Sequence, residues 1–113
     1  MDLGLNNRVA LVTGSARGIG RMEAEVLAAE GATIAINDLD GDTARKTAKE
    51  ISTKYSVETM AITCDVTNET EVQDMVERLS KHFGRFDILV NNAGIGGEDI
   101  GHKVIDMTVD NWN

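Results

Sequence analysis

Three glycines near the start of the chain have a spacing that suits phosphate binding. Gly14, Gly18 and Gly20 lie between an apolar run at residues 9–12 and an amphipathic stretch that follows. Gly14 would permit a tight turn, Gly18 would let the backbone approach a pyrophosphate without a Cβ in the way, and Gly20 would let the helix pack closely. The helix N-terminus would offer unpaired N–H groups and a partial positive charge. The spacing therefore predicts a dinucleotide-binding turn. Its other candidate cofactor contacts are Ser15, Arg17 and Ile19.

Two other interpretations of this turn compete with dinucleotide binding. One is an ordinary strand-to-helix connection that uses glycine for steric reasons only. The other is a P-loop, which the spacing excludes, because only three residues separate Gly14 from Gly18 and no Gly-Lys-Ser/Thr follows.

Asp38 is the acid that should meet the adenosine ribose. It follows a second apolar run, residues 33–36, and lies 18 residues after Gly20. Two negative charges about 4 Å apart repel by roughly 1 kcal/mol in water and about 4 kcal/mol at an effective dielectric constant of 20. A 2′-phosphate would therefore be disfavoured by about one to three powers of ten, and we expect NAD as the preferred cofactor. Arg17 could approach a 2′-phosphate, so NADP is the alternative cofactor, and Asp38 could instead be only a helix cap or turn residue.

Short apolar runs alternate with amphipathic stretches along the chain. The runs at residues 9–12, 33–36, 57–63 and 87–91 predict four strands separated by three helices. This alternation implies an α/β fold with a parallel sheet and right-handed crossovers. The residues expected to face the core are Ile19, Met22, Val26 and Leu27 in the first helix, Ala44, Ala48, Ile51 and Tyr55 in the second, and Val72, Met75, Val76, Leu79 and Phe83 in the third.

Capping residues are predicted for the third helix and for a possible fourth. Thr67 or Asn68 should begin the third helix, and with Asn68 as the cap Glu71 would complete a capping box. After residue 91 the chain is rich in glycine and then polar. Thr108 or Asp110 could cap a further helix.

Composition excludes several functional classes. The chain has 113 residues, 42% of them hydrophobic, which fits one globular domain spanning residues 1–113. Its net charge of −8 makes it a poor binder of nucleic acid or of an anionic membrane. Cys64 is the only cysteine, and no Cys/His cluster has zinc spacing, so we expect no metal site. No leader-like segment or run of roughly 20 apolar residues is visible, which favours a soluble cytoplasmic protein.

The motifs, taken together, resemble those of the short-chain dehydrogenase/reductase family. Thr13 precedes the three glycines, Asp65-Val66 follows the third predicted strand, and Asn91-Asn92-Ala93-Gly94 follows the fourth. The resemblance extends over residues 8–112 and implies a three-layer Rossmann fold with strand order 3-2-1-4. It also implies that Asp65 and Val66 contact the adenine. Asp65 could instead belong to the N-terminal cap of the next helix. The resemblance places Asn92, Ala93 and Gly94 near the ribose and nicotinamide.

The same resemblance implies hydride transfer between a nicotinamide and the carbon of a carbonyl or alcohol. The family uses a Tyr-x-x-x-Lys pair and an upstream Ser for this reaction. The only tyrosine here is Tyr55, and Thr59 stands where the lysine would be. No catalytic residue is therefore assigned, and we expect the chain to carry the cofactor-binding half and to be inactive alone. A dinucleotide-binding or interaction module without catalysis is the alternative, while the motifs argue against a nucleotide-fold methyltransferase.

Two further expectations follow from that resemblance. The family's strand order leaves residues 88–90 at an apolar edge without a neighbouring strand, which predicts marginal stability and self-association. Residues 95–107 would line the mouth of the site for a small carbonyl or alcohol substrate. The parent protein would be a dimer or tetramer, as family members often are.

Overall fold

The computed structural model describes residues 4–92 and 105–108. Its elements follow one another in the order β1 (Val9–Val12), α1 (Gly18–Ala29), β2 (Thr33–Asn37), α2 (Gly41–Tyr55), β3 (Thr59–Ile62), α3 (Glu69–Phe83), β4 (Ile88–Val90) and β5 (Ile105–Thr108). The strand order is β3-β2-β1-β4-β5, and β1 to β4 are parallel. The predicted α/β class and the order 3-2-1-4 are confirmed. β3 and β4 are each shorter than the apolar runs that predicted them.

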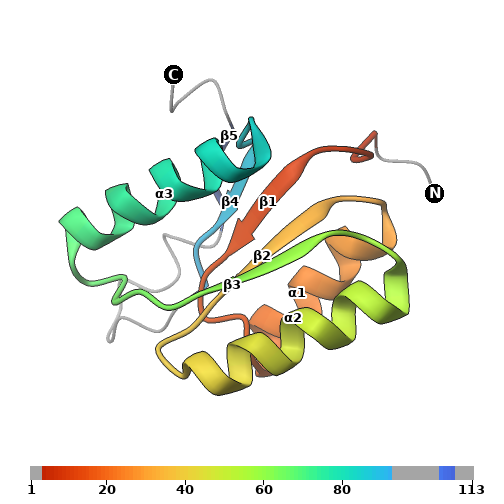
Figure 1. Ribbon diagram of the computed structural model, residues 1–113, viewed down its shortest axis with the longest axis horizontal. Helices are drawn as coiled ribbons and strands as arrows, with labels where there is room; N and C mark the ends of the chain where they lie inside the picture. Colours follow the sequence, from red (N-terminus) through yellow and green to blue (C-terminus); the bar gives the residue numbers. More distant parts are fainter. Residues whose placement is uncertain (1–3, 93–104, 109–113) are drawn as a thin grey trace.

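Helices cover both faces of the sheet, α1 and α2 on one face and α3 on the other (Figure 1). β1 is buried along its whole length, as its apolar run predicts, because both of its faces are covered. Its side chains alternate between two cores. Ala10 and Val12 belong to the core with α1 and α2, whereas Val9 and Leu11 belong to the core with α3. None of the described helices is both long and apolar enough to cross a membrane.

The predicted core face of α1 is wrong. Its fully buried residues are Gly20, Ala24 and Ala28, all of them small. Ile19, Met22 and Val26 are instead exposed, with 57–68% of their surface accessible. Small residues at a spacing of four let the helix axis approach the sheet, so the larger apolar side chains lie on other sides of the helix. Of the predicted set only Leu27 packs against the core.

The predicted core faces of α2 and α3 are confirmed, and both helices have side-chain caps. Asn68 caps α3 by accepting a hydrogen bond from the Glu71 N–H. The capping box is not completed, because Glu71 Oε1 accepts from the N–H of Asp65 at 3.1 Å rather than from that of Asn68. The Asn68 N–H donates instead to the Asp65 carbonyl, so the side chain of Glu71 holds the loop before the helix.

A fifth strand lies beside β4. β5 pairs antiparallel with β4, with Ile88 opposite Thr108 and Leu89 opposite Met107. The expectation of a bare apolar edge at residues 88–90 is therefore wrong, because backbone groups of β5 pair with that edge. Thr108 belongs to this strand rather than capping a helix. Asp110 lies outside the described residues, and self-association stays a prediction.

A buried carboxylate holds β4 beside β1 at the amino end of the sheet. Asp87 is 3% exposed and accepts from the Val9 N–H at 2.8 Å and from Arg85 Nε at 2.8 Å. Burial raises the pKa of Asp87, but the hydrogen bonds from Arg85 and the Val9 N–H outweigh that effect and hold its pKa below the usual value. The ionised carboxylate thus fixes the register that brings residues 91 and 92 beside the glycine turn.

Candidate dinucleotide-binding site

A pocket of about 250 Å³ opens where the carboxyl ends of β1, β2 and β3 meet. Four of the predicted site residues line it: Gly14, Asp38, Asp65 and Val66. They come from three separate loops, and the parallel sheet brings them together because its strands all end at the same edge. The other lining residues are Asn37, Leu39, Cys64 and Thr67.

The glycine turn requires glycine for two different reasons. Gly14 and Gly18 have φ of 59° and 66°, in the left-handed region that disfavours a side chain. A Cβ on Gly20 would overlap the Gly14 carbonyl oxygen and lie 2.8 Å from Asn92 Nδ2. The predicted close approach at Gly20 is thus made to the turn itself and to the loop after β4, rather than to the body of the sheet.

The N-terminus of α1 has no side-chain cap among the described residues. Arg17 is its N-cap residue and has an extended backbone, but it forms no capping hydrogen bond, and the first turn of the helix holds no acidic residue. The N–H groups of a first helical turn have no partner within the helix. This end of α1 is therefore suited to an anionic group.

Asp38 holds the glycine turn to the start of α2. Its Oδ2 accepts from the Ala16 N–H at 3.2 Å, and its Oδ1 accepts from the Asp40 N–H at 3.2 Å. The carboxylate also lines the pocket. The cap of α2 is Asp40. Asp38 therefore acts as a turn residue, which was the alternative role, and its predicted contact with the ribose stays a prediction.

Asp65, which also lines the pocket, begins a tight turn. Its Oδ1 accepts from the Thr67 N–H at 2.9 Å and from Thr67 Oγ1 at 2.6 Å. The bond from the Thr67 hydroxyl, followed by that from the Thr67 N–H, lowers the pKa of Asp65 and keeps it ionised at neutral pH. Asp65 is therefore an acceptor at the pocket as well as part of the lead-in to α3.

Asn92 lies beside the glycine turn. Its N–H donates to Thr13 Oγ1 at 2.7 Å, and that hydroxyl donates to Asn91 Oδ1 at 3.0 Å. Thr13 in this way connects the end of β1 to the end of β4, which places the Asn92 amide against Gly20. Ala93 and Gly94 lie outside the described residues, and their contacts stay predictions.

Ser15 and the exposed candidates of the turn have different surroundings. The Ser15 side chain is completely buried, and its hydroxyl donates to the Val12 carbonyl at 2.6 Å and accepts from the Asn37 N–H at 3.1 Å. Its own N–H donates to the Asn37 carbonyl, so both the hydroxyl and the N–H of Ser15 already have partners within the protein. Ile19 is 68% exposed, and the Arg17 side chain is also largely exposed. The contacts predicted for all three stay untested.

Two buried polar residues that shape this edge were missed from the sequence. Asn37 Nδ2 donates to the Ile62 and Cys64 carbonyls at 3.1 and 3.4 Å, which ties the end of β2 to that of β3. Thr47 Oγ1, on α2, donates to the Ala16 carbonyl at 2.6 Å and holds the glycine turn. The available signal was a polar residue inside an otherwise apolar face in each case.

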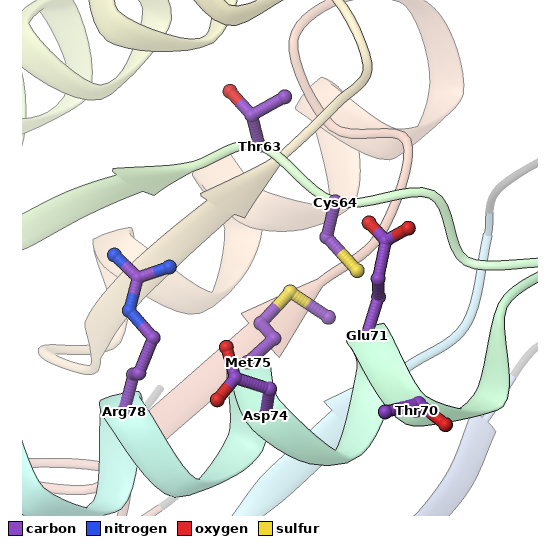
Figure 2. Close-up of a pocket in the computed structure, with 7 residues that line it drawn as sticks. All are labelled: Thr63, Cys64, Thr70, Glu71, Asp74, Met75 and Arg78. Atoms are coloured by element: carbon purple, nitrogen blue, oxygen red, sulfur yellow. The ribbon is translucent and has the colours of Figure 1, made fainter.

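Cys64 separates the candidate site from a second cavity of about 270 Å³ between the end of β3 and α3. Figure 2 shows its thiol beside Met75 and Glu71, with Asp74 next to Met75 and Arg78 farther along α3. Burial, and then the charges of Glu71, Asp65 and Asp74, raise the pKa of Cys64, so the thiol stays protonated and is a poor nucleophile. Within the described residues no group of three potential ligands could hold a metal ion.

Tyr55 lies away from this edge, at the last residue of α2. Its hydroxyl donates to Glu25 Oε1 at 2.8 Å, and its ring packs against the core shared with α1. The same Glu25 binds Arg21 and Lys54. The packing role predicted for Tyr55 is confirmed.

Comparison with known proteins places these features in one family. A model described as short chain dehydrogenase matches residues 8–113. The chain is 38% identical to an NAD(+) 15-hydroxyprostaglandin dehydrogenase of Macaca fascicularis, covering 93% of this chain and 40% of that protein. It is 41% identical to a 3-oxoacyl-(acyl-carrier-protein) reductase of Aquifex aeolicus, covering 84% of this chain and 38% of that protein.

Solved structures agree with the family match. The crystal structure of L-sorbose reductase from Gluconobacter frateurii, complexed with NADPH and L-sorbose, superposes with a TM-score of 0.80 at 39% identity, covering 86% of this chain and 37% of that one. NAD+-bound xylitol dehydrogenase gives a TM-score of 0.77 at 37% identity, covering 83% and 36%. The chain spans about two fifths of the length of these relatives. With its glycine turn, its strand order and the match over residues 8–113, the chain belongs to the short-chain dehydrogenase family.

Proposed function

We propose that the chain is the cofactor-binding part of an NAD-dependent oxidoreductase that transfers hydride between a nicotinamide and a carbonyl or alcohol carbon. The observation that carries this proposal is the uncapped N-terminus of α1, beside a pocket lined by Asp38 and Asp65. Backbone N–H donors at the helix end would suit the diphosphate of an adenosine diphosphate group, and the carboxylates at the pocket would suit its adenosine.

The residues present fit a dinucleotide part by part. The N–H groups at Gly18, Ile19 and Gly20 would bind the diphosphate, and the absence of a Cβ at Gly18 leaves open space above the turn. Asp38 would accept from the ribose hydroxyls. Asp65 would accept from the adenine amino group.

Leu39 and Val66 complete the proposed adenine site. Leu39 is an apolar side chain that is 70% exposed at the pocket wall, so it would cover one face of the adenine. The backbone of Val66 would contact the ring edge beside Asp65. Asn92, held by Thr13, would orient the far end of the cofactor.

The chemistry that a bound nicotinamide supplies is the donation or acceptance of a hydride. In this proposal the chain's own residues bind and orient that group, and the proton is exchanged by residues in the part of the family domain that this chain does not span. Tyr55 does not serve as the acid or base, because its hydroxyl is bonded to Glu25 at the end of α2 distant from the pocket. The substrate is a small carbonyl or alcohol compound, and the complete protein is a homo-oligomer.

NAD is proposed over NADP on the charge at the ribose. Asp38 lines the pocket, and a 2′-phosphate on the ribose would meet its carboxylate. The relatives carry both cofactors in their names, NAD(+) in the prostaglandin dehydrogenase and NADPH in the sorbose reductase complex. The preference is therefore argued from this chain's own residues.

Isothermal titration of the chain with NADH and NADPH tests the proposal. We expect NADH to bind at least about tenfold more tightly. Asp38→Asn should weaken NADH binding by about tenfold, because a hydrogen bond to a charged acceptor is lost, and should narrow the difference from NADPH. Asp42→Asn, which removes a charge from an exposed position on α2, is the control. Equal affinities in the unmodified chain would refute the NAD preference, and failure of both nucleotides to bind would refute the site.

A further inference from the structure

The positive side chain of the glycine turn is bonded to a second aspartate, at the start of α2. Arg17 Nη2 donates to Asp40 Oδ2 at 2.6 Å and to Thr43 Oγ1 at 3.2 Å. Thr43 Oγ1 donates in turn to the same Asp40 oxygen at 2.7 Å. The guanidinium thus lies at the start of α2 although 66% of the Arg17 side chain is exposed.

The two oxygens of Asp40 have separate tasks. Oδ1 accepts from the Thr43 N–H at 3.1 Å and caps α2, while Oδ2 binds Arg17. The Asp40 N–H donates to Asp38 Oδ1, which fixes the distance between the two aspartates along the loop. The Thr43 hydroxyl and N–H, and then Arg17, lower the pKa of Asp40, so the carboxylate is charged at neutral pH.

The ion pair between Arg17 and Asp40 affects how the site would receive a phosphate on the ribose, because Arg17, in the glycine turn, lies close to Asp38. Arg17 follows Ala16, whose N–H is bonded to Asp38 Oδ2. A phosphate at the ribose 2′ position would therefore lie between Asp38, which repels it, and Arg17, which could bind it. With Arg17 bonded to Asp40, the attractive partner is engaged elsewhere and only the repulsion remains.

We propose that Asp40 is a specificity-determining residue, which excludes NADP by holding the Arg17 guanidinium at the start of α2. This inference rests on the proposed function, since it concerns the choice between two dinucleotides. Asp38 acts on a 2′-phosphate directly, and Asp40 acts on it through Arg17. A solvent-exposed ion pair is weak, so the effect of Asp40 should be a moderate change in preference rather than a switch.

The test is a comparison of NADH and NADPH dissociation constants for Asp40→Asn. Asparagine caps a helix about as well as aspartate, so α2 should stay intact while the charge that holds Arg17 is lost. We expect the ratio of the NADPH to the NADH dissociation constant to fall about twofold to fivefold, mainly through tighter NADPH binding. Adenosine 2′,5′-bisphosphate and 5′-AMP, which differ in the 2′-phosphate, should show the same change in ratio.

Two matched variants separate the mechanism from a general effect of charge. Asp42→Asn removes an equal charge two residues away and frees Arg45 on the same helix. The ratio of its NADPH to its NADH dissociation constant should equal that of the unmodified chain. Arg17→Gln combined with Asp40→Asn should lose the gain in NADPH affinity. A gain that persists in the double variant, or an equal gain in Asp42→Asn, would overturn the proposal.

The outcomes for this inference and for the proposed function are distinct. If the unmodified chain binds neither NADH nor NADPH, the proposed function fails, and the role of Asp40 fails with it. If NADH binds as expected and Asp40→Asn keeps the original ratio, only the role of Asp40 is refuted. Thermal unfolding of each variant shows whether the fold is retained, and an unfolded Asp40→Asn is replaced by Asp40→Ser, which keeps a capping oxygen.

Discussion

The N-termini of α1 and α2 lie at the same edge of the sheet, but within the described residues only that of α2 is capped by a side chain. α2 begins with Asp40, whose side chain caps the helix, and Asp42 lies in its first turn. α1 begins with Arg17, has no side-chain cap and has no acid in its first turn. An uncapped helix end costs stability unless another group binds its N–H donors. The difference indicates that α2 is completed by its own sequence, whereas α1 leaves room for an anionic ligand.

The largest effect is expected when one methyl group obstructs the start of α1, because the proposed anion site lies there. Gly20→Ala would place a Cβ against the Gly14 carbonyl, so the turn must move. We expect NADH affinity to fall by at least about a hundredfold and the free energy of unfolding to fall by about 1–3 kcal/mol. Isothermal titration and urea unfolding measure the two effects.

The control for that change is another glycine outside the site. Gly84, at the end of α3, has φ of 78° and nothing within 4 Å of a built Cβ. Gly84→Ala should therefore cost about 1–2 kcal/mol of stability from the left-handed backbone and leave NADH affinity unchanged. Equal losses of affinity in both variants would contradict a specific role for the turn.

Removing the cap of α3 tests whether a capped helix end serves only the fold. Asn68 accepts from the Glu71 N–H at 3.1 Å. Asn68→Ala should lower the free energy of unfolding by about 1 kcal/mol, because one backbone donor loses its partner. NADH affinity should stay within about twofold of the unmodified value, a change of less than half a kcal/mol. A large loss of affinity would mean that the cap of α3 also supports the pocket.

Adding a cap to α1 should move stability and binding in opposite directions. Arg17 has the extended backbone of an N-cap residue, so Arg17→Ser supplies a capping hydroxyl, and Arg17→Ala removes the charge without supplying one. Relative to the alanine variant, the serine variant should be more stable by about 0.5–1 kcal/mol. It should bind NADH more weakly, because the hydroxyl competes for the same N–H groups. Parallel changes in both properties would contradict an anion site at this helix end.

The smallest expected effect is a dependence of stability on pH. It should arise from the cap of α2, which is the carboxylate of Asp40, and not from the cap of α3, which is the uncharged Asn68. The Thr43 hydroxyl and N–H, and then Arg17, hold the pKa of Asp40 below its unfolded value. The contribution of Asp40 to stability is therefore present above that unfolded pKa, about 3.9, and is lost as the pH falls through the lower folded pKa. Asp40→Asn should flatten the stability profile in this acidic range, measured by urea unfolding at successive pH values. If Asp40→Asn leaves the dependence of stability on pH unchanged, the pKa of Asp40 is not lowered by folding.

The local parts of the site could be predicted from the sequence. The tight turn at Gly14, a cap of α3 at Thr67 or Asn68, and the order of the strands and helices along the chain depend on near neighbours, which residue type and spacing reveal. The buried face of α1 could not be predicted in this way. Ile19, Met22 and Val26 have helical spacing, but the sheet accepts the side of the helix with the smallest residues. Hydrophobic periodicity does not encode how closely two elements approach.

The sequence alone determined the family motifs, the α/β order of the elements and the positions of Asp38 and Asp65 after the second and third strands, because these depend on short-range pattern. Only the tertiary structure decided which polar groups are already used. The hydroxyl of Ser15 is bonded to β1 and β2, and Arg17 is held by Asp40, 23 positions away. Partners so distant in the chain are chosen by the packing of α2 beside the glycine turn, since charge and hydrogen-bond geometry act only after the elements have met.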